Sequence, residues 1–173
     1  MKIYGIQKLT LLDFPGHTAC TIFLAGCDWR CPYCHNTDLI DGTASPVMDD
    51  EELLAFLRKR QGLLDGVAIT GGEPLLWREL PDLMERIRQL GYQVKLDTNG
   101  CHPDLLRDIL DRHLADYVAM DIKNSPDLYG DTTGCPGINL DRITRSAAYL
   151  ITGSVDYEFR TTVVAELHDD ASV

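Results

Sequence analysis

Short apolar runs alternate with amphipathic stretches along most of the chain. The apolar runs predict buried strands over Ala19–Ala25, Val67–Thr70, Gln93–Leu96, Tyr117–Met120 and Tyr157–Val164, with an edge strand over Ile3–Leu9 before them. Apolar residues at helical spacing predict helices over Met48–Arg60, Glu79–Leu90, Pro103–Arg112 and Leu140–Leu150. Strands that alternate with helices in this way are typical of a parallel sheet with right-handed crossovers.

The length of the chain limits how far such a sheet can close. A closed (βα)8 barrel typically needs about 250 residues, and this chain has 173. We therefore expect an α/β fold built as a partial, open parallel (βα) barrel of about five to six strands.

The carboxyl end lacks the helix that this pattern would supply next. After the last predicted strand the sequence continues as an acidic loop, Ala165–Val173. A parallel strand is normally covered on both faces. We expect a single domain over residues 1–173, and two interpretations of its end stay open: a truncated product, or a minimal form that a partner completes.

Charge and composition narrow the classes of function. The chain has 27 acidic and 16 basic residues, which gives a formal net charge of −11. This excess disfavours binding to nucleic acid or to an anionic membrane. No apolar run approaches the roughly 20 residues that span a bilayer, and residues 1–12 lack the features of a signal peptide. We therefore expect a cytoplasmic protein, in which the six cysteines are thiols or metal ligands rather than disulfides.

Three of the cysteines stand together in the run CDWRCPYC, directly after the strand predicted to end at Ala25. Cys27, Cys31 and Cys34 have C-x3-C-x2-C spacing, so their thiolates can surround one compact soft-metal centre. Structural zinc needs a fourth ligand; His35 is a candidate by composition, but a ring next to Cys34 is poorly placed to reach the same metal. A [4Fe–4S] cluster held by three cysteines leaves one iron open to a substrate. The spacing favours the cluster, with zinc as the alternative.

The same loop resembles the signature of the radical S-adenosylmethionine (SAM) superfamily, in which an aromatic residue, here Tyr33, precedes the last cysteine. The continuation YCHN is similar to the branch of activating enzymes (activases) that act on glycyl-radical enzymes. Gly5–Asn36 is similar to the first segment of the anaerobic ribonucleoside-triphosphate reductase activating proteins.

This resemblance implies a fold, two cofactors and a reaction. The fold is the partial (βα) barrel of radical SAM enzymes, and the cofactors are a [4Fe–4S] cluster and SAM. The reaction is reductive cleavage of SAM, followed by formation of a glycyl radical on a partner enzyme. Anaerobic ribonucleotide reductase is the expected partner, and flavodoxin or ferredoxin is the expected reductant.

A glycine pair follows the second long strand in the run GGEP. Two glycines let a ligand approach the backbone closely, although such a run alone is usually a turn. Its position after a strand, downstream of the cysteine loop, resembles the GGE motif of the superfamily. The resemblance implies that Gly71, Gly72 and Glu73 contact the amino group of SAM. It also implies that Tyr33 and His35 line the adenine pocket.

Polar residues end the next two strands, in the runs DTNG and DIK. Turn chemistry and a ligand contact both stay open for Asn99, because Asn and Asp favour turns and caps. For Asp121 and Lys123 the resemblance implies contacts to the ribose and the carboxylate of SAM. Asp97, Thr98 and Asp121 also resemble the monovalent-cation site of the activases, and oxygen ligands suit such a cation.

Arg160 lies within the last predicted strand, among apolar neighbours. A charge in such a place is unfavourable unless it is paired. The SAM carboxylate would supply that pairing, and an ion pair with Glu158 or Asp156 is the other interpretation. No role is assigned to His168, Cys20, Cys101 and Cys135.

The motifs all follow the carboxyl ends of predicted parallel strands. In (βα) barrels the loops at that end face one cavity and carry the catalytic groups. We therefore expect a single site for the cluster and SAM. Three alternatives stay open: a small-molecule radical SAM enzyme such as a carbon-insertion or deazapurine-type synthase, a zinc-binding interaction module, and an electron carrier.

Overall fold

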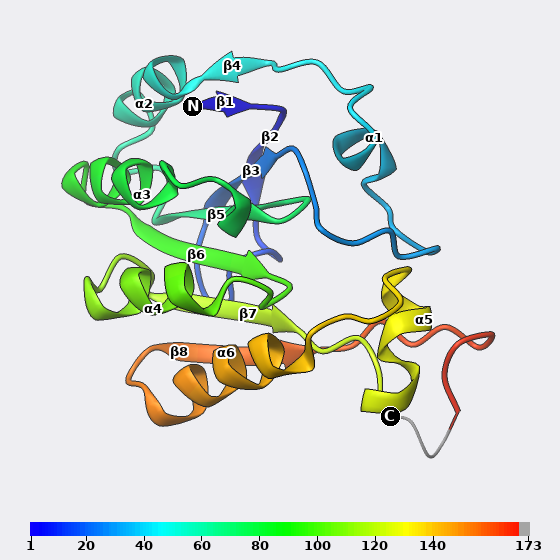
Figure 1. The fold of residues 1–173 in the computed structure, drawn as a ribbon. Helices are drawn as coiled ribbons and strands as arrows, with labels where there is room; N and C mark the ends of the chain where they lie inside the picture. The colour runs from blue at the N-terminus through cyan, green and yellow to red at the C-terminus, as the bar shows by residue number, and fades with distance from the viewer. Residues whose placement is uncertain (170–173) are drawn as a thin grey trace.

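The computed structural model describes residues 1–169, and its centre is a six-stranded sheet (Figure 1). The strands lie in the spatial order β2 (Gly5–Thr10), β3 (Ala19–Leu24), β5 (Gly66–Gly71), β6 (Gln93–Thr98), β7 (Tyr117–Asp121) and β8 (Asp156–Arg160). Neighbouring strands from β3 to β8 are parallel, whereas β2 pairs with β3 in antiparallel orientation. The sheet is open, with β2 and β8 at its edges. The expected partial parallel barrel is confirmed.

Four longer helices stack on one face of this sheet (Figure 1). They are α2 (Asp50–Arg58), α3 (Leu80–Gln89), α4 (Pro103–Asp111) and α6 (Leu140–Thr152). Their sequences supply both start signals and apolar stripes: α2 begins with a capping box between Asp49 and Glu52, and α3 buries Leu83, Met84 and Ile87. The four predicted helices are confirmed, and their ends differ slightly from the prediction.

Several short elements were not predicted as separate elements, because they are too short to show a period. These are β1 (Lys2–Ile3), α1 (Thr37–Ile40), β4 (Met48–Asp49), η1 (Pro74–Leu76), η2 (Pro126–Leu128) and α5 (Tyr129–Thr133). β4 takes the first two residues of the predicted helix Met48–Arg60. β1 and β4 form a small antiparallel sheet. α1 and α5 lie near the side where β6 and β7 end (Figure 1). Within residues 1–169, no helix combines the length and the apolar character needed to cross a membrane.

The two faces of the sheet differ in chemistry. On β6, Val94 and Leu96 belong to the hydrophobic core, so Lys95 and Asp97, which alternate with them, point to the opposite face. We call that opposite face the inner face. It carries charged side chains, whereas the face beneath the helices is apolar. This alternation positions the groups described below.

The last strand is shorter than predicted and remains partly uncovered. β8 ends at Arg160, and residues 161–164 are irregular. The rings of Tyr157 and Phe159 pack together, 5.2 Å apart, and these residues are 37% and 39% exposed. The predicted lack of a covering helix is thus observed over residues 161–169, and the rest of the predicted acidic loop lies outside the described residues.

Candidate functional site

A cavity of ≈ 270 Å³ lies at the carboxyl ends of the parallel strands. The expected site residues that line it are Cys27, Cys31, Tyr33, Cys34, His35, Gly71, Gly72, Asp97, Thr98, Asn99, Asp121, Lys123 and Arg160. Parallel strands end at one edge of a sheet, which is why residues so distant along the chain meet here. Of the predicted set, Glu73 alone is missing from the wall.

The loop Gly26–Asn36, which we call the cysteine loop, is tied to the protein along its whole length. Its N–H and amide groups make three bonds: Gly26 N–H to the Leu39 carbonyl (2.8 Å), Arg30 N–H to the Thr133 carbonyl (2.9 Å), and the Asn36 side-chain amide to the Gly71 carbonyl (3.0 Å). The Trp29 ring also packs edge-on against Tyr129 of α5. α1, the end of β5 and α5 therefore hold the cysteine loop in place.

The environment of the cysteine sulfurs suits metal-bound thiolates. Trp29 N–H donates to Cys27 Sγ and Asn36 N–H donates to Cys34 Sγ, each at 3.4 Å. Burial raises the pKa of the Cys27 thiol to about 11 and also raises the pKa of Cys31. These thiols therefore stay protonated near neutral pH unless a metal binds, since coordination removes the proton outright.

The three thiols at the cavity fit the donor set of an iron–sulfur cluster. A [4Fe–4S] cube binds each thiolate through a different iron, so its ligands stand apart. Cys27, Cys31 and Cys34 line one cavity and fit this donor set.

Close packing against the cysteine loop requires both glycines of the GGEP run. Gly71 has φ +128°, and a Cβ there would lie 2.2 Å from the Leu24 carbonyl oxygen. A Cβ on Gly72 would lie 1.9 Å from the carbonyl oxygen of Gly26. The sequence indicated room for a ligand, whereas the structure shows that the pair also joins two loops of the site.

Glu73 lies behind the cavity rather than in its wall. Its carboxylate is fully buried and accepts hydrogen bonds from Leu75 N–H (2.9 Å), the Thr98 hydroxyl (2.8 Å) and Asn99 N–H (2.6 Å). Burial raises its pKa to about 7, although these three bonds act in the opposite direction. Both oxygens of Glu73 join the loops after β5 and β6, and the expected contact of the GGE run with the amino group of SAM stays a prediction.

A row of alternating charges, which we call the charged row, crosses the floor of the site from β6 to β8. Its ion pairs are Lys95 Nζ–Asp97 Oδ1 (2.5 Å), Arg160 Nη1–Asp97 Oδ2 (3.4 Å), Arg160 Nε–Asp121 Oδ1 (3.2 Å) and Lys123 Nζ–Asp121 Oδ2 (2.9 Å). Burial disfavours the charge on Lys123 and Arg160, but the neighbouring carboxylates prevail and raise the pKa of both. Arg160 thus pairs with Asp97 and Asp121, and the alternative ion pair with Glu158 or Asp156 is not the one formed.

The structure adds residues to the predicted lining of the site. Trp29, Asn36, Ile40, Thr70 and Thr162 also line the cavity. A period of two would have found Thr162 from Arg160, and Lys95 of the charged row from Asp97.

One unsatisfied group in the wall of the cavity indicates a ligand. The Tyr33 hydroxyl is buried and has no hydrogen-bond partner within the described residues, and a buried polar group of this kind normally has one. Cys101 and Cys135 are not among the residues that line the cavity. His168 lies beside the site and contacts the Lys123 carbonyl through Nε2 (2.8 Å).

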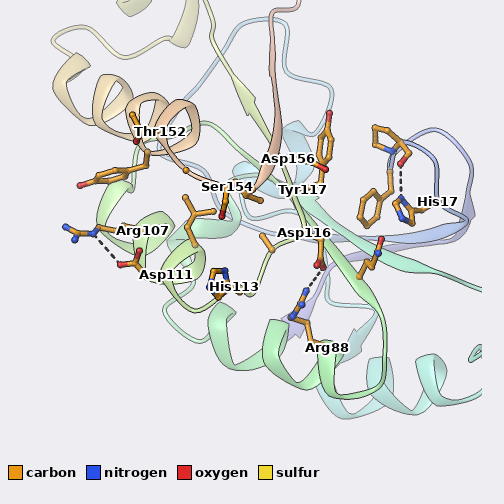
Figure 2. A pocket seen from close by; sticks show the side chains of 18 residues that line it. His17, Arg88, Arg107, Asp111, His113, Asp116, Tyr117, Thr152, Ser154 and Asp156 are labelled. Atoms are coloured by element: carbon orange, nitrogen blue, oxygen red, sulfur yellow. Dashed lines mark hydrogen bonds and ion pairs between the residues drawn. The ribbon is translucent and has the colours of Figure 1, made fainter.

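A second cavity of ≈ 990 Å³ lies at the amino ends of the strands (Figure 2). Its charged groups are largely neutralised in pairs, Arg88 with Asp116 and Arg107 with Asp111 (Figure 2). The described residues that line it include no cysteine. Its size alone therefore gives it no evident chemistry.

An open parallel sheet with a three-cysteine loop and a glycine pair at its carboxyl edge defines a class of (βα) proteins that hold an iron–sulfur cluster beside a small-molecule cavity. The chain belongs to the radical SAM superfamily, whose sequence pattern matches residues 21–167. Its cofactors are accordingly a [4Fe–4S] cluster and SAM.

Several curated relatives cover much of the chain. A Methanocaldococcus jannaschii protein, provisionally named a glycyl-radical enzyme activating enzyme, is 30% identical over 99% of this chain and 72% of its own length. Pyruvate formate-lyase-activating enzyme of Clostridium pasteurianum is 34% identical over 73% of the chain and 54% of its own length. 7-Carboxy-7-deazaguanine synthase of Thermococcus kodakarensis is 33% identical over 58% of the chain and 47% of its own length. The chain thus spans only about half of the last two relatives.

A solved structure agrees on the fold. The structure of TYW1 with a bound lysine–pyruvate adduct superposes with a TM-score of 0.67 and 18% sequence identity. The match covers 88% of this chain and 57% of TYW1.

Proposed function

We propose that this chain is a radical SAM activase, which cleaves SAM reductively and installs a glycyl radical on a partner enzyme. The observation that carries the proposal is the meeting of the three cysteines with four members of the charged row at one cavity, namely Asp97, Asp121, Lys123 and Arg160. The relatives from Methanocaldococcus jannaschii and Clostridium pasteurianum support the activase branch. Anaerobic ribonucleotide reductase is the partner that the sequence resemblance favours.

Three side chains of the cysteine loop would hold the cluster, namely Cys27, Cys31 and Cys34. When bound and reduced, the cluster supplies the electron that splits SAM into methionine and a 5′-deoxyadenosyl radical. The protein contributes orientation and the exclusion of water. Trp29, which is only 3% exposed, shields the loop on the side of α5.

The remaining residues of the wall would bind SAM by its separate groups. Lys123 and Arg160 are the cations that suit the carboxylate, since both lie at the cavity and are partly desolvated. Asp121 would accept from the ribose hydroxyls, and the Gly71–Gly72 backbone would meet the amino group. Further along the wall, Tyr33 and His35 would line the adenine, and Asn99 would complete the rim.

The source of electrons and the setting follow from the same chemistry. A flavodoxin or ferredoxin is the reductant we propose, because the cluster must reach the low end of the range of potentials that proteins give such centres. We place the reaction in the cytoplasm, where free thiols persist, since all six cysteines are free in the structure.

The test is anaerobic reconstitution followed by an assay with candidate partner enzymes. We expect 5′-deoxyadenosine release that depends on the partner, together with a glycyl radical seen by electron paramagnetic resonance. A partner in which the radical-bearing glycine is replaced by alanine is the matched control and should give no protein radical. Iron and sulfide in the protein without any SAM cleavage would contradict the proposal.

A small-molecule radical SAM enzyme is the second candidate, because the deazaguanine synthase of Thermococcus kodakarensis is 33% identical to part of this chain. SAM cleavage that depends on an added small-molecule substrate, in the absence of any protein partner, would favour it. A preparation that contains zinc but no iron or sulfide would instead indicate a zinc-binding module.

A further inference from the structure

A buried ammonium group lies beside Asp97, where the family resemblance implies a monovalent cation. Lys95 precedes Asp97 by two residues on β6, so both side chains point to the inner face of the sheet. The Lys95 Nζ lies 2.5 Å from Asp97 Oδ1, and the side chain is only 2% exposed. The ammonium is therefore a fixed part of the protein interior.

The two carboxylates that would bind a metal cation already face cationic side chains. Arg160 faces Asp97 Oδ2 at 3.4 Å and Asp121 Oδ1 at 3.2 Å. Lys123 faces Asp121 Oδ2 at 2.9 Å. Together with Lys95, these contacts give every oxygen of both carboxylates a cationic nitrogen.

The third expected ligand and the balance of charge agree with this. The Thr98 hydroxyl donates its hydrogen to Glu73 at 2.8 Å and accepts from Gly100 N–H at 3.0 Å. Each carboxylate of the charged row already faces two cationic side chains, so a further cation would compete with them for the same oxygens. The residues of this site do not fit a bound potassium or sodium ion.

Within the charged row, Lys95 is the cation least able to leave. The Arg160 side chain is 38% exposed and can turn toward an anionic ligand. The Lys95 ammonium has no such freedom, because it is enclosed and also lies over the Tyr117 ring, 5.9 Å from its centre. A buried charge is retained only with its partner, so Lys95 and Asp97 hold each other in place.

We propose that Lys95 is a built-in counter-cation, which pairs with Asp97 and holds it in position so that the SAM site works without a bound monovalent cation. Lys95 is a positioning residue, because it touches Asp97 and does not line the cavity. The part of this inference that concerns SAM rests on the proposed function. The part that concerns the cation does not.

The first test compares thermal unfolding of the cluster-free protein in potassium chloride and in N-methylglucamine chloride at equal ionic strength. We expect no potassium-specific stabilisation of the wild type. Lys95→Met should unfold at a lower temperature and should recover stability with a saturable dependence on potassium, because a ligand that binds the folded state stabilises it by mass action. Lys95→Arg, which keeps the charge, and Lys8→Met, which removes an exposed lysine, should both behave like the wild type.

Two outcomes overturn the inference. One is a potassium-specific stabilisation of the wild type. The other is a Lys95→Met variant that potassium does not stabilise, which would assign Lys95 a purely structural role. If Lys95→Met folds only when potassium is present, the inference is supported, and failure to fold in either salt counts against it.

The second test measures SAM affinity of the reconstituted protein by equilibrium dialysis in the same two salts. We expect wild-type affinities that agree within about twofold, and a Lys95→Met affinity at least about tenfold weaker without potassium. Potassium should restore most of that loss. If the SAM affinity of Lys95→Met is lower and potassium does not restore it, the inference about Lys95 is overturned, whereas the proposed function stands. If the wild type binds no SAM, the proposed function fails, and the unfolding measurement still decides the role of Lys95.

Discussion

The two ends of the sheet carry cavities of opposite character. The cavity at the amino ends has a volume of ≈ 990 Å³, and the cavity at the carboxyl ends ≈ 270 Å³. The larger one has charges that neutralise each other on its rim, as in Arg88 with Asp116. The smaller one gathers thiols, glycine backbone and an unsatisfied tyrosine hydroxyl. The convergence of reactive groups, and not the volume of the cavity, therefore indicates where the site of this protein lies.

The two edges also differ in how closely their glycines are packed. At the carboxyl edge, successive loops are tied to one another, as in the three hydrogen bonds that Glu73 accepts. At the amino edge, Gly16 lies in the connection between β2 and β3. A Cβ added to Gly16 would have no neighbouring atom within 4 Å. Substitutions at the two ends should therefore differ in effect, and the differences can be measured.

The largest effect should come from Cys31→Ala. It removes one of three cluster ligands, and we expect loss of the cluster and of all SAM cleavage. Iron and sulfide content after anaerobic reconstitution measures the loss of the cluster. Release of 5′-deoxyadenosine measures the loss of SAM cleavage. Cys135→Ala is the matched control, because this thiol donates to the Asp28 carbonyl beside the same loop but does not line the cavity. Cleavage retained by Cys31→Ala would refute the site.

Next in size should be the contrast between Gly72→Ala and Gly16→Ala. A Cβ on Gly72 meets the Gly26 carbonyl oxygen at 1.9 Å, so we expect a loss of about 3 kcal/mol or more in the free energy of unfolding and poor cluster incorporation. Gly16 has φ +77° and open space, so only backbone strain of about 1 kcal/mol applies. Urea unfolding under anaerobic conditions gives both values. Equal losses would remove the distinction between the two ends.

A smaller effect should appear in the pH dependence of stability. The pKa of Glu73 is raised by burial to about 7 from an ordinary value of 4.5. Between these values the folded protein binds more protons than the unfolded chain, so the free energy of unfolding falls as pH rises. The full contribution is about 3 kcal/mol at most. Glu73→Gln should flatten the curve between pH 5 and 8, and an unchanged slope would show that this carboxyl does not titrate there.

The smallest effect should be a selective loss of SAM affinity in Asp121→Ala. This change removes the partner of Lys123 and Arg160 at the cavity, and we expect binding weaker by about tenfold with normal iron content. Asp116→Ala breaks the ion pair with Arg88 at the other end and should leave SAM affinity unchanged. Equal losses of affinity and of iron in Asp121→Ala would contradict its role.

Much of the site could be predicted because its signals are local. The spacing of Cys27, Cys31 and Cys34 and the Gly71–Gly72 pair are each contained in a few residues. The parallel topology then brings these runs to one edge, as expected from the alternation of strands and helices. The four long helices were predictable for the same reason, since their apolar stripes repeat over several turns.

What the sequence did not reveal depends on contacts between distant segments. Glu73 stands beside the glycine pair in the sequence, yet its carboxylate turns away to bond Thr98 and Asn99. Lys95 stands two residues before Asp97 on the same strand, but only the structure shows that Lys95 is buried and that Arg160 from β8 also pairs with Asp97. α5 is too short to show a period, although it supports the cysteine loop through the Thr133 carbonyl.

The ties of the cysteine loop bear on the order in which the protein is built. A zinc finger folds only around its metal, so binding and folding are one event. Here the Leu39, Thr133 and Gly71 carbonyls already hold the loop through hydrogen bonds that involve no metal. Iron and sulfide would then bind to a loop that other parts of the fold already position. Folding of the chain and assembly of the cluster would be separate events.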